Sequence, residues 1–442
     1  MKRRIDAQLD AWKDSTRRKP LVLFGARQVG KTYAIRQFAD RAFDSLVYVD
    51  FSRDARASAM FDDSIAPTDV VNGLELLSGK TIDPERTLIV FDEVQLCERA
   101  LTSLKYFCDE APQYHVVAAG SLLGVKVNRS KYSFPVGKVD MMTLHPMDFE
   151  EYLWARGDVR LADAIAGAYE TSDRPFAFHD MAMDAVREYF AVGGMPEAVT
   201  VFVDGKDASV GNALDACRSV QRDIVTAYVA DMAKYAPSGE SQRIVDAWNS
   251  IPRQFAKENH KFQYKEIRSG ARANAYQGAL TWLVSAGIVT RLTQVGEPDA
   301  PLRAFENPNI FKIYMADTGL LGCECDVLPA SLLPADDKAA SFRGALNENF
   351  VLQQLTAWDV HAHYWGMASK AEVEFVASDR NGDVIPIEVK SGRRVTARSL
   401  SAYREKYRPP YVVRVSAKNF GFDNGIRSVP LYAAWILAQG LR

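Results

Sequence analysis

The stretch that decides the fold is Pro20-Leu-Val-Leu-Phe-Gly25-Ala-Arg-Gln-Val-Gly30-Lys31-Thr32. Its short apolar run predicts a buried strand, and the phosphate-loop pattern GxxxxGK[ST] follows directly. The glycines allow backbone N–H groups to surround a phosphate chain, and the helix that starts near Gly30 adds the positive end of its dipole. A glycine-rich turn is the alternative, but the strand in front of it favours nucleotide binding.

Each position of this loop has an expected role. Lys31 is expected to reach the β- and γ-phosphates of ATP, and the Thr32 hydroxyl is expected to ligate Mg²⁺. We expect the whole loop to contact the nucleotide, through Gly25, Ala26, Arg27, Gln28, Val29, Gly30, Lys31 and Thr32.

The stretch Thr87-Leu-Ile-Val-Phe-Asp92-Glu93 supplies the second half of such a site. Its continuous apolar run needs cover on both faces, which is typical of the middle of a parallel sheet. We expect Asp92 to hold Mg²⁺, directly or through water. Glu93 is the expected catalytic carboxylate, because it would polarise the water that attacks the γ-phosphate.

Length and composition indicate a globular protein of several domains. The chain has 442 residues, enough for two or three domains, and 48% of them are hydrophobic. A net charge of −2 provides no overall basic field for nucleic acid, although a local patch stays open. The longest apolar stretch, 279–289, is too short to span a bilayer, so we expect a cytoplasmic protein that does not enter the membrane.

The five cysteines form no paired framework and are expected to be reduced thiols. Cys323 and Cys325 have the spacing of half a metal site, but no second Cys or His pair matches it.

Short apolar strands alternate with helical patterns in the first 195 residues, which predicts an α/β fold. The expected strands are 21–24, 46–51, 88–91 and 116–119. In a parallel sheet with right-handed crossovers, the phosphate loop and the later strand ends share one edge. Ser121 follows the last of these strands, so it is either a catalytic sensor of the γ-phosphate or part of a simple turn.

Five motifs in order carry a family resemblance: GARQVGKT, LIVFDEVQ, AAGSLLG, LHPMDFEEYL and GGMPEAV, the last at 193–199. The chain resembles, over nearly its whole length, a widespread group of prokaryotic AAA-type ATPases. Members carry a C-terminal domain of uncertain function related to the PD-(D/E)xK nucleases. Such proteins often have Arg where this chain has Lys138, so Arg129 and Arg222 are the candidates for an arginine finger.

The resemblance implies three domains: an AAA-like P-loop ATPase core over 1–195, a helical and winged-helix region over 196–320, and an α/β PD-(D/E)xK-like domain over 338–442. Helices are expected at 241–257, 264–269 and 274–286, with a β-ribbon after them. The third helix begins without Lys or Arg, so protein packing is favoured over DNA reading there.

In the third domain we expect a helix over 341–355 and two strands at 373–376 and 385–390, joined by a turn. Residues two apart in a strand share a face, so Glu388 and Lys390 point together. By the resemblance, Glu348, Glu374 and Glu388 would bind Mg²⁺ and Lys390 would orient or activate water. Glu374 stands where Asp is usual.

These observations predict a cytoplasmic, Mg²⁺-dependent ATPase whose ATP-driven change is passed to its C-terminal domains. Two alternatives stay open: a DNA nuclease gated by ATP, and a slow nucleotide switch or scaffold for a protein partner. ATP and Mg²⁺ are the expected ligands. DNA, a protein partner and a second copy of the chain remain open as partners.

Overall fold

The structure is a computed structural model that describes residues 1–121, 123–127, 134–171, 174–236, 239–255, 261–334, 340–367, 371–390 and 398–442. The chain divides into two compact units. The N-terminal unit comprises Lys2–His145 with Ser285–Gly287, and the C-terminal unit comprises Pro146–Val284 and Ile288–Arg442 with Met1.

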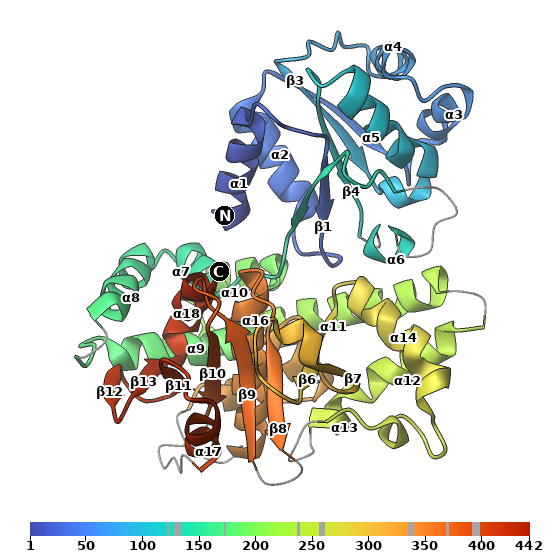
Figure 1. The fold of residues 1–442 in the computed structure, drawn as a ribbon. Coiled ribbons are helices and arrows are strands. Elements are labelled where there is room, and N and C mark those ends of the chain that lie inside the picture. The colour runs from blue at the N-terminus through green and yellow to red at the C-terminus, as the bar shows by residue number, and fades with distance from the viewer. Residues whose placement is uncertain are drawn as a thin grey trace. The chain divides into compact units, whose positions relative to one another are not determined.

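The N-terminal unit is built on a parallel sheet of five strands in the order β2-β3-β4-β1-β5, with helices on both sides (Figure 1). The strands are β1 (Leu21–Phe24), β2 (Ser45–Asp50), β3 (Thr87–Asp92), β4 (His115–Ala119) and β5 (Asp140–Thr143). The helices are α1 (Arg4–Asp14), α2 (Lys31–Ala42), α3 (Ala55–Asp63), α4 (Pro67–Ser78), η1 (Val94–Leu96), α5 (Glu98–Glu110) and α6 (Leu123–Val127).

The core of this unit explains why its central strands are apolar throughout. Every residue of β3 and β4 is buried. One hydrophobic cluster joins strands β2, β3 and β4 to α3, α4 and α5, and the rings of Phe51, Phe61 and Phe91 contact one another in it. A strand covered on both faces has no solvated side, so alternation disappears. The predicted α/β fold with a parallel sheet is confirmed.

The C-terminal unit contains a mixed sheet of eight strands in the order β12-β13-β11-β10-β9-β8-β6-β7 (Figure 1). The strands are β6 (Val289–Val295), β7 (Glu306–Met315), β8 (His363–Met367), β9 (Ala371–Ser378), β10 (Val384–Val389), β11 (Val412–Ser416), β12 (Gly421–Asp423) and β13 (Ile426–Pro430). Pairs β6/β8, β10/β11 and β11/β13 are parallel, and the others are antiparallel.

Helices make up the rest of the C-terminal unit. They are α7 (Phe149–Ala155), α8 (Val159–Thr171), α9 (His179–Val192), α10 (Pro196–Gly205), α11 (Val210–Tyr235), α12 (Ser241–Asn249), α13 (Ile251–Phe255), η2 (Tyr264–Glu266), α14 (Ala273–Ser285), η3 (Leu302–Phe305), α15 (Thr318–Glu324), η4 (Pro329–Leu332), α16 (Ala340–Ala357), α17 (Arg398–Tyr407), η5 (Leu431–Ala433) and α18 (Ala434–Leu441). None of the helices within the described residues is long and apolar enough to cross a membrane.

The two units differ from the expected three segments. The hairpin of β6 and β7, expected in the middle segment, lies in the same sheet as β8 to β13, because β6 pairs with β8 through Gln294–Tyr364 and Val295–Trp365. Residues 146–195, expected with the ATPase core, lie in the C-terminal unit. Sheet pairing between segments far apart in sequence leaves no local signal at the boundary.

The expected winged-helix pattern is present only in part. The helix expected over 241–257 is two helices, α12 and α13, and residues 256–260 lie outside the described part. The second expected helix is a single 3₁₀ turn, η2. The third helix, α14, and the ribbon of β6 and β7 are found, but the ribbon continues into the large sheet.

The motif GGMPEAV forms a buried joint in the C-terminal unit. Gly193 has φ 75°, and a Cβ there would lie 2.3 Å from Asp317 Oδ1. The Gly194 N–H donates to Asp317 Oδ2 at 2.5 Å, and a Cβ on Gly194 would lie 2.0 Å from the Met147 carbonyl oxygen. Asp317 also caps α15 by accepting from Leu320 N. The two glycines therefore permit a close approach of three segments.

Helix α7 begins at Phe149. Asp148 is its N-cap: its carboxylate accepts from Glu151 N, and Glu151 Oε2 accepts from Asp148 N at 3.3 Å. This capping box satisfies two helix-end donors and sets the first turn.

Candidate functional site

The phosphate loop has the backbone conformation that its glycines were expected to permit. Gly25 has φ 144°, Gln28 has φ 65° and Gly30 has φ 95°. A Cβ on Gly25 would lie 2.3 Å from the Leu144 carbonyl oxygen, so only glycine fits there. Because α2 starts at Lys31, directly after the loop, the unpaired N–H groups of its first turn adjoin the loop.

Lys31 is buried against the loop that precedes it. Its ammonium donates to the carbonyl oxygens of Gly25 and Ala26, at 2.8 Å each. Burial lowers the pKa of Lys31 to about 8, although the nearby carboxylates of Glu93 and Asp92 act in the opposite direction. The lysine therefore retains its positive charge at neutral pH in a poorly solvated position.

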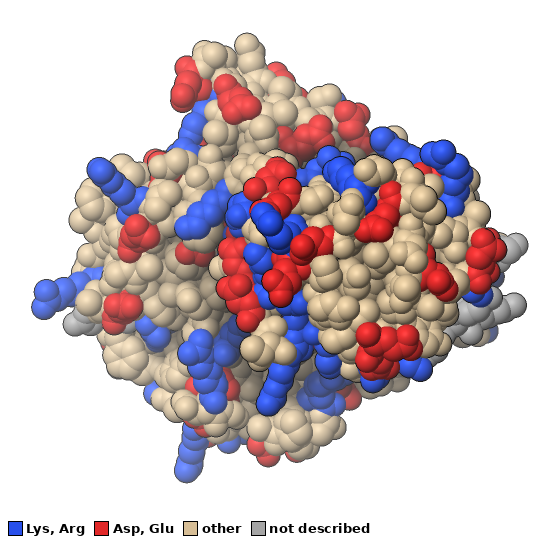
Figure 2. Space-filling view, turned by 90° about the horizontal axis from the view of Figure 1, so that it is seen from above, with Lys and Arg blue, Asp and Glu red and all other residues tan. Residues whose placement is uncertain are grey.

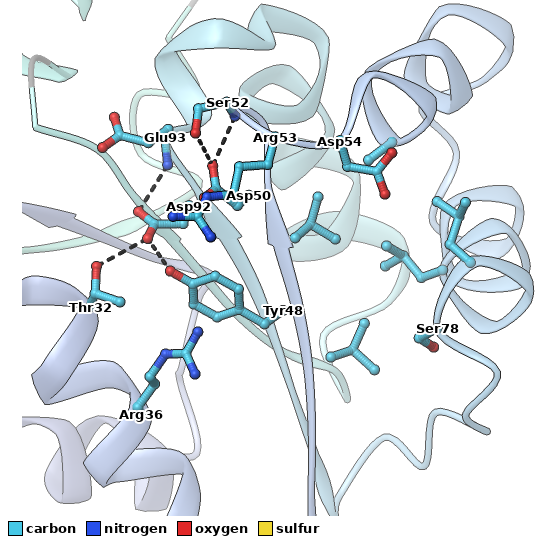
Figure 3. Close-up of a pocket in the computed structure, with 15 residues that line it drawn as sticks. Thr32, Arg36, Tyr48, Asp50, Ser52, Arg53, Asp54, Ser78, Asp92 and Glu93 are labelled. Carbon is cyan, nitrogen blue, oxygen red and sulfur yellow. Dashed lines mark hydrogen bonds and ion pairs between the residues drawn. The ribbon is translucent and has the colours of Figure 1, made fainter.

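Asp92 and Thr32 meet at the carboxyl edge of the sheet. The Thr32 hydroxyl donates to Asp92 Oδ2 at 3.1 Å, and the Tyr48 hydroxyl donates to the same oxygen (Figure 3). Burial and the hydrogen bond to Asp92 raise the pKa of Tyr48, so its hydroxyl remains a donor. A hydroxyl and a carboxylate side by side are the hard oxygen ligands that Mg²⁺ prefers, so these two residues fit the ion.

Glu93 follows Asp92 in a left-handed conformation, with φ 51°. Its backbone N–H donates to Asp92 Oδ1 at 2.9 Å, and its own Oε2 accepts from the Gln95 amide and from the Ser121 hydroxyl, the latter at 3.4 Å. The structure therefore brings the three candidate catalytic residues of separate stretches, Lys31, Glu93 and Ser121, to the carboxyl edge of one sheet.

A pocket of about 600 Å³ opens beside the two acids (Figure 3). It extends from Asp92 and Glu93 along β2 to helices α3 and α4. The residues that line it are Thr32, Arg36, Val47, Tyr48, Val49, Asp50, Ser52, Arg53, Asp54, Ala57, Leu74, Leu77, Ser78, Asp92 and Glu93. The pocket combines charged and apolar walls, and both acids of the site line it.

Sequence reasoning missed Tyr48 and Arg36. Arg36 is one helical turn after Thr32, which places both on the same face of α2, and its guanidinium lies 4.6 Å from the centre of the Tyr48 ring. That spacing is a usable signal for Arg36. Tyr48 has none, because its contact depends on β2 lying next to β3.

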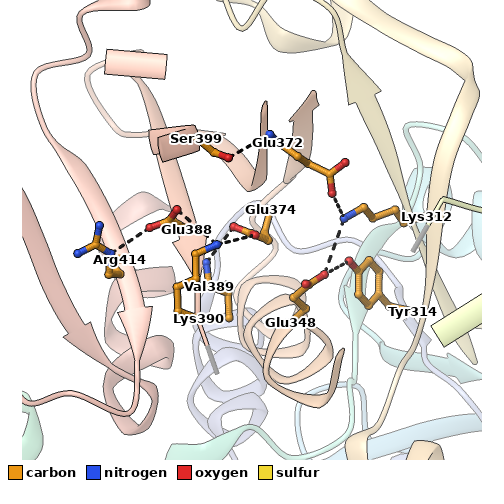
Figure 4. Close-up of polar contacts among 10 residues, drawn as sticks. All are labelled: Lys312, Tyr314, Glu348, Glu372, Glu374, Glu388, Val389, Lys390, Ser399 and Arg414. Atoms are coloured by element: carbon orange, nitrogen blue, oxygen red, sulfur yellow. Dashed lines mark hydrogen bonds and ion pairs between the residues drawn. The ribbon is translucent and has the colours of Figure 1, made fainter. Parts of the chain in front are cut away.

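A second group of charged residues lies in the C-terminal unit (Figure 4). Glu374 and Glu388, from adjacent strands β9 and β10, both contact Lys390 Nζ, at 3.3 and 3.4 Å. Glu348, from α16, accepts from the Tyr314 hydroxyl at 2.8 Å and lies 3.8 Å from Lys312 Nζ. The four residues expected from the resemblance are therefore brought into one neighbourhood.

Four further residues of this group were not foreseen: Lys312, Tyr314, Glu372 and Arg414. Lys312 Nζ lies 2.6 Å from Glu372 Oε1, and Arg414 Nε donates to Glu388 Oε2 at 3.0 Å. We call Glu348, Glu372, Glu374 and Glu388 the carboxylate cluster. Residues from β7 and β11 reach the cluster only because these strands belong to the same sheet. No local sequence pattern therefore predicts that they lie there.

Burial and charge act against each other in this cluster. Burial raises the pKa of Glu374 to about 7, although Lys390 lowers it. For Lys312 and Lys390, burial lowers the pKa, but the neighbouring carboxylates outweigh it, so both pKa values are raised. Both lysines therefore stay charged well above neutral pH.

The remaining expected residues are placed as follows. Arg129 lies outside the described residues. Lys138 pairs with Asp109 at 2.5 Å, and Arg222 lies on α11. Cys323 and Cys325 are free thiols, and the described part of the chain contains no group of three or more His, Cys, Asp and Glu side chains suited to a metal ion. On the face shown in Figure 2, basic and acidic side chains are interspersed.

Three segments of the chain match family models. Residues 17–153 match the AAA domain, residues 183–330 match a domain of unknown function (DUF8612), and residues 343–434 match a second domain of unknown function (DUF4143). A search of curated proteins gives no match.

Several solved structures are similar to the chain at low identity. ORC1 of Aeropyrum pernix in complex with DNA is 15% identical, covers 75% of this chain and 92% of its own, and has a TM-score of 0.31. ORC2 of Aeropyrum pernix in its ADPNP-ADP complexes is 11% identical, with coverages of 75% and 96% and a TM-score of 0.33. AMPPCP-bound DnaA of Aquifex aeolicus is 11% identical, with coverages of 63% and 85% and a TM-score of 0.28.

The match to the AAA domain covers the parallel sheet and its phosphate loop. Residues 183–330 and 343–434 correspond to domains whose function is unknown. Over residues 17–153, the chain carries an AAA domain.

Proposed function

We propose that the chain binds ATP with Mg²⁺ at the phosphate loop and hydrolyses it. The observation that carries this proposal is the meeting of Lys31, Thr32, Asp92 and Glu93 at the carboxyl edge of β1 and β3. The loop N–H groups and Lys31 would bind the phosphates, and Thr32 with Asp92 would hold Mg²⁺, which supplies charge neutralisation at the β- and γ-phosphates.

Glu93 is the proposed catalytic residue. Its Oε2 is held by Gln95 and Ser121, so the carboxylate has a defined position next to Asp92. A carboxylate oriented in this way accepts a proton from, or polarises, a water that attacks the γ-phosphate. Ser121 would sense the γ-phosphate from the end of β4, and the pocket beside Asp92 and Glu93 would admit the water.

ATP turnover would in turn drive or gate an activity of the C-terminal unit on a nucleic-acid or protein partner. A nucleotide can shift a conformational equilibrium only through different affinities for the two states. A slow nucleotide switch, which binds ATP and hydrolyses it only rarely, would use the same site. Measuring turnover with and without DNA, together with the mass of the protein in solution, separates these versions.

The test of nucleotide binding is Lys31→Ala, measured by calorimetry with ATP and Mg²⁺. Removal of a charge-assisted contact to the phosphates should weaken ATP binding on the order of 100-fold. Lys105→Ala, an exposed lysine on α5, is the matched control and should bind ATP like the parent. Undiminished ATP affinity in Lys31→Ala would reject the assignment.

A further inference from the structure

Three members of the carboxylate cluster, Glu348, Glu374 and Glu388, were expected to bind Mg²⁺. The cations that surround the cluster decide how its charge is neutralised. Four glutamates lie near three cations, which come from β7, β11 and the end of β10. Glu388 is fully buried, and Lys312 is 1% exposed. Charges in such positions are costly unless each is paired.

We propose that the carboxylate cluster takes its compensating positive charge from Lys312, Lys390 and Arg414, and that it binds no divalent cation. The cluster is then an internal ion-pair network that ties β7 to α16, β9, β10 and β11. This proposal is independent of the nucleotide site, because all its residues lie in the C-terminal unit.

The contacts of Glu374 and Glu388 support this proposal. Both oxygens of Glu374 are engaged: Oε2 accepts from Val389 N at 3.1 Å, and Oε1 accepts from Lys390 Nζ at 3.3 Å. Glu388 Oε2 accepts from Arg414 Nε at 3.0 Å, and Glu388 Oε1 forms an ion pair with Lys390 Nζ at 3.4 Å without a hydrogen bond. Mg²⁺ needs oxygen ligands at about 2.0–2.1 Å in near-octahedral geometry. An ion bridging Glu374 and Glu388 would have to displace the Lys390 ammonium from both.

The charges of Glu348 and Glu372 are neutralised in the same way. Lys312 lies between Glu372 and Glu348, and Glu348 also accepts from the Tyr314 hydroxyl. A third carboxylate for a metal would therefore have to give up its contact with Lys312, which is buried. Two ammonium groups already contact these carboxylates, so the residues do not fit Mg²⁺ as they are arranged.

This network also has a structural consequence. Lys312 belongs to the β6/β7 hairpin, whereas its partners belong to the segment after residue 340. The charges therefore add side-chain links to the backbone pairing of β6 with β8. The hairpin and the C-terminal strands would move as one body.

The first experiment titrates Mn²⁺ into the full chain without nucleotide, with electron paramagnetic resonance to count free ion. The parent and Glu388→Gln should bind the same amount of Mn²⁺, and Asp92→Asn should remove whatever binds at the phosphate loop. An equivalent of Mn²⁺ that the parent binds and Glu388→Gln loses would overturn the proposal. Glu374→Gln gives the same comparison if Glu388→Gln does not fold.

The second experiment removes the cation that Glu374 and Glu388 share, which is Lys390. Lys390→Met leaves two buried carboxylates without their shared partner, so the midpoint of urea unfolding should fall, and added Glu374→Gln should restore part of the loss. A Lys390→Met protein as stable as the parent would contradict the proposal. A drop that Glu374→Gln does not reverse would also contradict it, because the lysine would then act through packing alone.

Discussion

The two units assemble their charged sites by different routes. In the N-terminal unit, the site residues follow three strands of one parallel sheet, in short stretches that each carry their own pattern. In the C-terminal unit, the carboxylate cluster and its cations come from five elements spread over 312–414. A parallel sheet places all its strand ends at one edge, which makes such a site predictable from sequence. A mixed sheet places residues together by pairing, which sequence does not reveal.

The largest expected effect concerns the predictable site. Glu93→Gln keeps the shape of the side chain and its contact with Ser121 but loses the charge that polarises water. ATP should still bind, and turnover should fall by a factor of about 10²–10⁴, as for loss of a general base. Phosphate release under saturating ATP is the measurement.

Glu110→Gln, at the exposed end of α5, is the control for Glu93→Gln and should leave turnover unchanged. If Glu93→Gln hydrolyses ATP at the parent rate, the catalytic role passes to Asp92 or Gln95, and the local pattern would have misled.

The second prediction concerns a joint made by distant segments. Gly193→Ala places a Cβ against Asp317 at a backbone conformation that glycine alone adopts easily, with φ 75° and ψ −166°. We expect a loss of about 3 kcal/mol in the free energy of unfolding of the C-terminal unit. Six of the seven tryptophans lie in that unit, so tryptophan fluorescence during urea unfolding is a suitable measurement.

Gly270→Ala is the matched control for this joint. Gly270 also has φ 75°, but a Cβ there would have no heavy atom within 4 Å among the residues that the structure describes. It should cost only about 1 kcal/mol, for the left-handed backbone alone. Equal losses in the two variants would show that Asp317 yields easily, and that the joint is looser than its distances suggest.

The third prediction tests the contact between Tyr48 and Asp92 in the nucleotide site. Tyr48→Phe removes the hydroxyl that donates to Asp92 Oδ2. A hydrogen bond to a charged group contributes roughly 1.5 kcal/mol, so the Mg²⁺ concentration for half-maximal turnover should rise about tenfold, with the rate at saturating Mg²⁺ nearly unchanged. Tyr106→Phe, on α5, is the control. A fall in the saturated rate without any shift in Mg²⁺ dependence would assign Tyr48 to the chemistry instead.

These contrasts show which parts of the fold and of the sites could be predicted from the sequence. The phosphate loop, Asp92 and Glu93 were predictable because each stretch combines a strand pattern with a chemical motif. Tyr48, Lys312 and Arg414 were not, because their positions depend on which strands are neighbours. The hairpin β6/β7 was expected from its pattern, but its membership of an eight-stranded sheet was not, since β6 pairs with a strand about 70 residues later.

The smallest expected effect is a pH dependence that separates the two sites further. Burial raises the pKa of Glu374 from 4.5 to about 7, so the folded chain holds this proton more tightly than the unfolded chain. The contribution to stability is complete below pH 4.5 and is lost as pH rises towards 7. We expect the free energy of unfolding to change by on the order of 1 kcal/mol per pH unit over that range. Urea unfolding of the parent and of Glu374→Gln between pH 5 and 8 measures it. The parent should lose stability relative to the variant as pH rises, because only the parent loses the Glu374 proton. The titrations of groups common to both proteins cancel in this comparison. An unchanged difference would mean that Glu374 is already ionised at pH 5, and that Lys390 neutralises it more strongly than burial opposes it.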